Sequence, residues 1–280
     1  MNTCDSSKID AATRRGFLRA LTALAGAAAL PPVRAAEAAT TEDAAAAIMK
    51  TGSEVILIVL YPGFTAMDAM GPEYMLSCMA GAKVRFIAAT RDPVKTESGF
   101  LVTPHLTFAE CPPKPTLVLV PGGAGGTLNA LGDAALLTFL RTVAADAARM
   151  GSVCTGSLLL GAAGLLDGYE ATSHWQTVDL LALTGAKPSR KRVVFDRDRV
   201  TGAGVTAGLD LGLALVREYR GATYAQGGQL LGEYDPRPDF PAEGNPATAN
   251  PVMVKLLNDM HQPFIAQMGD AVRQARAATP

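Results

Sequence analysis

Short apolar runs alternate with amphipathic segments along most of the chain. Continuous apolar runs at residues 55–60, 84–89 and 117–120 are typical of parallel strands that are buried on both faces. Residues 64–79 and 133–150 carry apolar side chains at helical spacing. Strands that alternate with helices predict an α/β fold, in which one parallel sheet is covered by helices on both faces.

The same alternation continues to the carboxyl end of the chain. Residues 94–108 alternate like a β-hairpin insertion with a turn at 97–99, and residues 233–246 form a polar, proline-rich segment. The remaining expected elements are strands at 171–173, 192–195 and 199–201, and helices at 157–163, 176–183, 209–219, 223–231 and 250–274.

The first 53 residues do not follow this pattern. Arg14 and Arg15 lie in a twin-arginine motif, which is followed by an apolar, alanine-rich run and a small-residue cleavage site at 33–35. We therefore predict a twin-arginine signal peptide at 1–35 and a periplasmic protein, exported by the twin-arginine machinery and free of the membrane after cleavage. Residues 36–53 are expected to form a leader, either a tether or a loose helix. A single domain is then expected at 54–280, with a core at 54–219 and a helical extension at 220–280.

The charge balance argues against nucleic acid as a partner. Residues 1–35 contain five of the 25 Lys and Arg and two of the 26 Asp and Glu, so the remainder has a formal charge of −4. A mildly acidic surface repels phosphate backbones and anionic lipid headgroups. We expect a small-molecule partner instead.

Cysteine and histidine are sparse. Cys4 falls in the predicted signal peptide, so an odd number of cysteines remains and at least one thiol is free. Whether Cys78 and Cys111 pair stays open. The three histidines lie far apart and no Cys-x-x-Cys motif is present, so we expect no metal site.

Residues 151–161 have the pattern of a nucleophile elbow, a sharp turn from strand to helix with the nucleophile at its apex. Gly151, Ser152 and Gly156 are small, as such a turn requires. Cys154 would sit over a helix N-terminus, where unpaired N–H groups and the helix dipole favour its thiolate. The alternative is that Cys154 only fills the core, as many lone cysteines do.

Three segments are expected at the carboxyl edge of the sheet, where parallel α/β sheets place their chemistry: residues 62–68, residues 121–125 and Cys154. Asp68 is the candidate acid and base beside Cys154; it could also cap a helix. Glu73 is the second candidate acid.

Gly122 and Gly123 could offer backbone N–H groups as an oxyanion hole, or could form only a tight turn. Of the histidines, His174 is the one considered for a direct role, although it more simply opens a helix. His105 and His261 are interpreted as structural or solvated.

Four segments carry a family resemblance. They are residues 121–123, 153–166, 171–175 and 201–210. With them, residues 54–219 resemble the DJ-1/PfpI superfamily. The run Cys-Thr-Gly-Ser from Cys154, the Gly-Pro that follows Asp68, and Tyr234-Asp-Pro are similar to its isonitrile (isocyanide) hydratase branch. The resemblance implies a flavodoxin-like fold, usually a homodimer, with no cofactor.

The resemblance also implies a chemistry. Cys154 would attack the terminal carbon of an isocyanide to form a thioimidate, and Asp68 would donate a proton and then activate water, giving an N-substituted formamide. Thr155 would stabilise the site through its hydroxyl or its N–H. The N–H groups of Gly123 and Val205 would hold the polarised intermediate or the thiolate.

Two alternatives stay open at this point. Related proteins use an accessible, low-pKa cysteine as an oxidation sensor in a stress response, without turnover. Others are small-molecule hydrolases, which would want a histidine near Cys154. The same core is also found in transcription regulators with helix-turn-helix domains, but only about sixty residues follow the core here.

Overall fold

The computed structural model describes residues 40–278. The predicted signal peptide and most of the leader lie outside the described residues. The compact unit begins at Thr41. Its first element is helix α2 (Thr41–Ile48), which packs against α8 (Ala222–Leu231), so residues 41–48 of the leader are helical.

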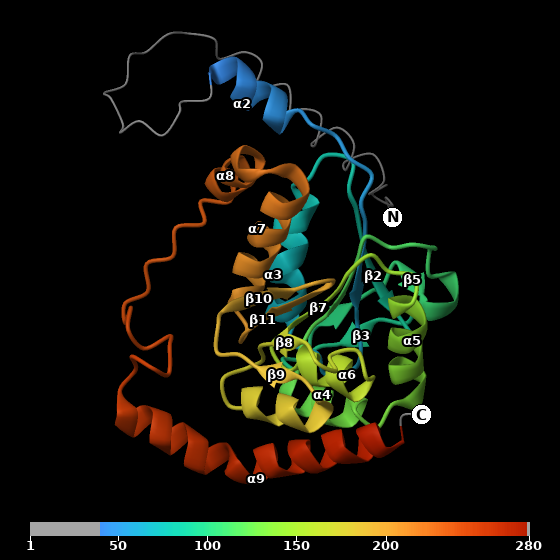
Figure 1. The fold of residues 1–280 in the computed structure, drawn as a ribbon, viewed down its shortest axis with the longest axis vertical. Coiled ribbons are helices and arrows are strands. Elements are labelled where there is room, and N and C mark those ends of the chain that lie inside the picture. The colour runs from blue at the N-terminus through green and yellow to red at the C-terminus, as the bar shows by residue number, and fades with distance from the viewer. Residues whose placement is uncertain (1–39, 279–280) are drawn as a thin grey trace, which may run out of the picture. The chain divides into compact units, whose positions relative to one another are not determined.

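A seven-stranded sheet forms the centre of this unit (Figure 1). The strand order is β10-β11-β7-β6-β1-β2-β5, and every neighbouring pair is parallel except β10 and β11. The bounds are β1 Val55–Val59, β2 Lys83–Ala88, β5 Leu106–Thr107, β6 Leu117–Val120, β7 Met150–Val153, β10 Val193–Asp196 and β11 Arg199–Gly202. The predicted flavodoxin-like, mostly parallel sheet is confirmed.

Helices cover both faces of the sheet, because its central strands are apolar on both sides. β1 and β6 are almost wholly buried, as their continuous apolar runs predict. On one side α3 (Ala66–Ser77) packs along α7 (Ala207–Arg220), and on the other α5 (Ala134–Ala144) packs against α6 (Gly156–Ala162) (Figure 1). The carboxyl half of α9 (Pro251–Ala277) buries Met268 and Val272, and the helix runs past α6 and α4 (Ala124–Ala130).

Several elements differ from the sequence expectation. The helix expected at 133–150 ends at Ala144, and Met150 begins β7. A turn at 97–99 does join a hairpin, β3 (Val94–Lys95) with β4 (Leu101–Val102), but β5 leaves it and pairs with β2 in the main sheet. The helix expected at 176–183 is a 3₁₀ helix, η2 (Val178–Thr184). Another short 3₁₀ helix, η1 (Phe108–Glu110), and a small sheet of β8 (Glu170–Ala171) with β9 (Lys187–Pro188) complete the unit.

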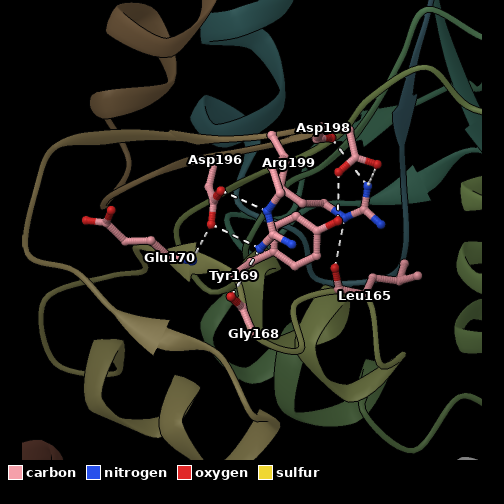
Figure 2. Close-up of polar contacts among 8 residues, drawn as sticks. Leu165, Gly168, Tyr169, Glu170, Asp196, Asp198 and Arg199 are labelled. Atoms are coloured by element: carbon pink, nitrogen blue, oxygen red, sulfur yellow. Dashed lines mark hydrogen bonds and ion pairs between the residues drawn. The ribbon is translucent and has the colours of Figure 1, made fainter.

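An aromatic and charged cluster contacts the turn of the β10–β11 hairpin (Figure 2). This turn lies beside the start of β7, at the edge of the sheet opposite Cys154. The guanidinium of Arg197 lies 3.5 Å from the centre of the Tyr169 ring, and that of Arg199 lies 4.9 Å from it. The Tyr169 hydroxyl donates to Asp198 at 2.8 Å, and Arg199 donates to the Leu165 carbonyl at 2.8 Å. This cluster holds the strand that ends beside the site described next.

Candidate active site

The backbone at Cys154 forms the predicted sharp turn between β7 and α6. Its φ is +58°, in the left-handed region that residues other than glycine rarely adopt. The Cys154 N–H donates to the carbonyls of Gly202 and Ala203 at 3.0 and 2.9 Å, and its own carbonyl accepts from the Ser157 and Ser173 hydroxyls. A Cβ on Gly156 would collide with the Val120 carbonyl, so the turn requires glycine there. The surroundings thus hold a strained conformation that costs about 1–3 kcal/mol.

Asp68 lies in the first turn of α3 and is completely buried. Its Oδ2 accepts the Gly122 N–H at 3.0 Å. Its Oδ1 is buried and accepts no hydrogen bond from the part of the chain that the structure describes. The N-cap position belongs to Thr65, so the interpretation of Asp68 as a helix cap is wrong. A buried carboxyl group with one oxygen unpartnered is instead typical of a group kept for chemistry.

A chain of hydroxyl groups surrounds Thr155, which is 4 % exposed. Thr155 Oγ1 accepts the Gly123 N–H at 3.0 Å and lies 2.7 Å from Thr127 Oγ1. The Tyr61 hydroxyl lies 3.0 Å from Thr127 Oγ1 and donates to the Pro121 carbonyl at 2.8 Å. Thr155 is therefore linked through side chains to Thr127 in α4 and to Tyr61 in the segment that follows β1.

Gly122 and Gly123 do not form an open oxyanion hole, which corrects the sequence expectation. The N–H of Gly122 is taken by Asp68, and that of Gly123 by Thr155. A Cβ on Gly122 would lie 2.6 Å from the Thr155 nitrogen and 2.7 Å from Asp68 Oδ2, so glycine lets these three groups meet. Hydrogen bonds from the N–H groups of Thr155 and Val205, rather than those of Gly122 and Gly123, lower the pKa of the Cys154 thiol.

The ionisation of Asp68 and Cys154 is coupled. Burial raises the pKa of Asp68 to about 7; the Gly122 N–H and the Cys154 thiol oppose that rise, and the charge of Glu97 adds to it. Burial also raises the pKa of Cys154, and the Asp68 charge adds to the rise against the N–H groups of Thr155 and Val205. Cys154 is 5 % exposed. The expectation of an accessible sulfur is therefore wrong, and burial opposes the thiolate that the helix N-terminus favours.

The other candidate acids lie further out. Glu97 is exposed on the β3–β4 turn, and its Oε2 accepts the Thr65 hydroxyl at 2.7 Å. Glu73 lies five residues beyond Asp68 in α3, about 140° around the helix from it. Asp68 is thus the carboxyl group beside Cys154, and Glu97 acts on it through its charge.

His105 and His261 contact parts of the fold away from Cys154, whereas His174 packs against the loop whose Ala203 carbonyl accepts the Cys154 N–H. A Cβ on Gly204 would lie 2.9 Å from His174 Cδ2, so the His174 ring packs closely on this glycine. The His174 Nδ1 accepts the Gln176 N–H at 3.4 Å, and burial lowers the pKa of His174. His105 Nδ1 accepts the Phe86 N–H at 2.9 Å, and His261 on α9 lies 3.2 Å from Gln176 Oε1. These contacts fit the structural interpretation of all three.

Within residues 40–278, no group of three or more His, Cys, Asp or Glu side chains is placed to bind a metal ion. No helix in the same range is long and apolar enough to cross a membrane.

The sequence did not point to Tyr61 and Thr127. Both are buried and hold Thr155 from a distance in sequence. The sequence signals them only by their position: Tyr61 lies two residues after the end of β1, and Thr127 lies in the helix that follows Gly122-Gly123.

A mostly parallel sheet with a strained turn at Cys154 beside a buried carboxyl group defines an α/β protein with a buried cysteine at its strand-to-helix elbow. The model of the DJ-1/PfpI family matches residues 54–218, and the chain belongs to this family.

Two proteins of Pseudomonas resemble the chain over most of its length. It is 43 % identical to the isonitrile hydratase of Pseudomonas putida over 220 residues, which cover 78 % of this chain and 95 % of the relative. The crystal structure of a THiJ/PfpI family protein from Pseudomonas syringae superimposes with a TM-score of 0.77 at 46 % identity, covering 79 % of this chain and 91 % of that one.

A transcription regulator matches a smaller part. The HTH-type regulator GbdR of Pseudomonas aeruginosa is 36 % identical over 132 residues, which are 46 % of this chain and 35 % of the regulator. The chain thus shares one segment with regulators, and nearly its whole domain with a protein named as a hydratase.

Proposed function

We propose that this protein hydrates isocyanides to N-substituted formamides, with Cys154 as nucleophile and Asp68 as acid and base. The observation that carries the proposal is the pairing of a strained, buried Cys154 with a buried Asp68 whose pKa is raised to about 7. Identity to the isonitrile hydratase of Pseudomonas putida over 95 % of that protein supports the choice of substrate.

The first half of the reaction forms a carbon–sulfur bond. The ionised Asp68 takes the thiol proton as the Cys154 sulfur attacks the terminal carbon of the isocyanide. The electron pair on that carbon then takes the same proton from Asp68, which leaves a thioimidate on Cys154. A carboxyl group with a pKa near neutrality suits both proton transfers, because it gains and loses a proton at similar cost.

The second half consumes water. Asp68, again ionised, removes a proton from a water molecule that attacks the thioimidate carbon, and that proton passes to the nitrogen. The carbon–sulfur bond then breaks, the sulfur takes the hydroxyl proton, and the formamide leaves. One water is added to one isocyanide, and both side chains return to their starting state.

The rest of the site keeps these groups in place. Gly122 fixes one oxygen of Asp68, so the unpartnered Oδ1 is left for proton transfer. The N–H groups of Thr155 and Val205 stabilise charge on the sulfur. The hydroxyl chain through Thr127 and Tyr61 fixes Thr155.

Burial of Cys154 also separates this function from oxidation sensing. A sensor cysteine reacts as an accessible thiolate, whereas Cys154 is 5 % exposed and its pKa is raised. The geometry therefore favours a thiol that is activated only when Asp68 takes its proton.

The rate of formamide formation by two variants, Cys154→Ala and Asp68→Asn, tests the proposal. Formamide formation from an aliphatic and an aromatic isocyanide should be abolished in Cys154→Ala and fall at least about 100-fold in Asp68→Asn. Asp270→Asn is the matched control, because Asp270 pairs with Arg273 on the surface of α9, and its activity should equal that of the wild type. Absence of formamide with the wild type, or full activity in Asp68→Asn, would contradict the proposal.

A further inference from the structure

The loop at residues 203–206, called here the Val205 loop, forms one wall of the site. The Cys154 N–H donates to the Ala203 carbonyl at 2.9 Å, so the loop lies against Cys154. A hydrogen bond from the Val205 N–H in the same loop lowers the pKa of the Cys154 thiol. The loop leads directly into α7, since the Ala207 N–H donates to the Gly204 carbonyl at 2.9 Å. The position of the Val205 N–H is therefore set by whatever holds this loop.

Arg192 holds the loop at both ends. At the start of the loop, the Ala203 N–H donates to the Arg192 carbonyl at 2.8 Å. At its end, Arg192 Nη2 donates to the Thr206 hydroxyl at 3.1 Å. The Nε of the same guanidinium is hydrogen-bonded to Asp210 Oδ2 in the first turn of α7.

A residue from the carboxyl-terminal extension completes this arrangement. The Tyr234 hydroxyl donates to Asp210 Oδ1 at 2.8 Å, so the two oxygens of Asp210 bind Tyr234 and Arg192. Tyr234 is itself fixed to the end of α8, because its N–H donates to the Gln229 carbonyl at 3.0 Å. The planar guanidinium thus sits in a fixed orientation, which a fork of donors requires.

We propose that Arg192 is a positioning residue for the nucleophile: together with Asp210 and Tyr234 it places the Val205 N–H against the Cys154 sulfur. This inference deepens the proposed function, because it concerns the same nucleophile. It also assigns a role in the active site to the segment that follows α8.

The exposure of Arg192 separates positioning from stability. Its side chain is 51 % exposed, and ion pairs at such positions add little to the free energy of unfolding. Removing the guanidinium should therefore leave the melting temperature nearly unchanged, while the Val205 loop loses its fixed place. The sulfur would then lose one of the N–H groups that stabilise its charge.

Alkylation of Cys154 by iodoacetamide measures this effect without an isocyanide. The rate is followed between pH 7 and 10 by mass spectrometry of the peptide that contains Cys154. In Arg192→Gln the rate should fall about tenfold, because a displaced N–H stabilises the thiolate less. Tyr234→Phe should lower it less, and Arg192→Lys should fall between the wild type and Arg192→Gln, since lysine lacks the fork.

Arg190→Gln is the matched control, because Arg190 lies two residues away and pairs with Asp179 on the surface. Its alkylation rate should equal that of the wild type. A merely structural role of Arg192 would give the opposite result, since a loosened site exposes Cys154 and speeds alkylation. A rate in Arg192→Gln that equals or exceeds the wild-type rate overturns the inference.

Steady-state kinetics separate this inference from the hydratase proposal. With an isocyanide, Arg192→Gln should lower kcat about tenfold and leave KM within about twofold, because the lost interaction acts on the reacting sulfur. Slow alkylation in the variant, with no turnover in any form, would sustain the positioning role and refute the hydratase. Turnover in the wild type with unchanged alkylation in the variant would refute the positioning role alone.

Discussion

The buried carboxyl group of Asp68 destabilises the folded protein when it is ionised. Its side chain is completely buried, and burial raises its pKa to about 7, so its charge at neutral pH is kept against a desolvation cost. A carboxyl group that only stabilised the fold would seldom be buried at such a desolvation cost. The cost makes two predictions possible at the scale of single residues.

The first prediction concerns stability. The unfolded chain loses the Asp68 proton near pH 3.8, whereas the folded protein keeps it until about pH 7. The native state thus binds more protons between these values, so the contribution of Asp68 to stability is full below pH 3.8 and is lost as pH rises to about 7. Asp68→Asn removes this loss, and its amide oxygen can still accept the Gly122 N–H.

Urea denaturation of the wild type and Asp68→Asn at pH 4.5 and 8 measures the difference. The variant should be more stable at pH 8, by at most about 4 kcal/mol, and the gap should shrink at pH 4.5. A variant that is less stable at pH 8 would show that Asp68 is a structural group.

The second prediction concerns the pH profile. The charge of Glu97 raises the pKa of Asp68, so Glu97→Gln should lower it. In the proposed mechanism kcat/KM falls at low pH, where Asp68 is protonated and cannot take the thiol proton. The acidic limb should therefore move to lower pH in Glu97→Gln, with up to about twofold more activity at pH 6.

Glu110→Gln serves as the control for this profile, because Glu110 pairs with Arg91 at the surface. Its profile should match that of the wild type. A shift of the acidic limb to higher pH in Glu97→Gln would contradict the assignment of that limb to Asp68.

At the scale of elements, a buried ion pair ties the end of α7 to the segment before β1. Arg220 donates to both oxygens of Glu54 and to the carbonyls of Lys50 and Ala80. The Arg220 side chain is 1 % exposed, so no water replaces a lost partner. The end of α7 is thereby fixed to β1, which leads to the site.

Glu54→Gln should therefore lower the free energy of unfolding by about 2–4 kcal/mol, because it leaves a buried guanidinium without its counter-charge. The measurement is urea denaturation at pH 7. Asp259→Asn, which breaks an exposed pair with Lys255, should cost less than about 0.5 kcal/mol. Equal effects of the two substitutions would refute the claim that the Glu54 pair is buried and structural.

The central strands could be predicted from the sequence, because full burial demands apolar residues on both faces. Helix α4 was missed, since its Gly-rich start is typical of a loop. Its stability comes from packing, in which Gly126 lies against the backbone of Gly63. Such contacts between distant segments leave no local pattern.

The candidate site also has a part that could be predicted from the sequence and a part that could not. Cys154 and Asp68 could be found because each follows a strand at the same edge of the sheet. The burial of Cys154 and the use of the Gly122 and Gly123 N–H groups by side chains depend on the whole fold. Residue types at one turn predicted a lowered pKa for Cys154, whereas burial in the folded protein raises it.

At the scale of the whole molecule, two predictions rest on the sequence. The homodimer that the family resemblance implies stays a prediction, which light scattering of the purified protein would test. Export through the twin-arginine route also stays a prediction, and it rests on Arg14 and Arg15, outside the described residues.

Fractionation of bacteria that express the full chain tests export. The wild type should reach the periplasm, and replacing Arg14 and Arg15 together by Lys should leave it in the cytoplasm, because that route reads the arginine pair. Arg19→Lys is the control and should be exported. Periplasmic protein in the double variant would refute the twin-arginine signal.

The central claim is that Cys154 adds to an isocyanide with no leaving group, and the mass of the intact protein tests it most directly. The wild type is mixed with an aromatic isocyanide, the reaction is quenched in acid within milliseconds to seconds, and the mass of the intact protein is measured by mass spectrometry. We predict an adduct equal to the full mass of the isocyanide, located on the Cys154 peptide, that disappears as formamide appears. Formamide without an adduct at Cys154, or an adduct that persists without formamide, would contradict the account.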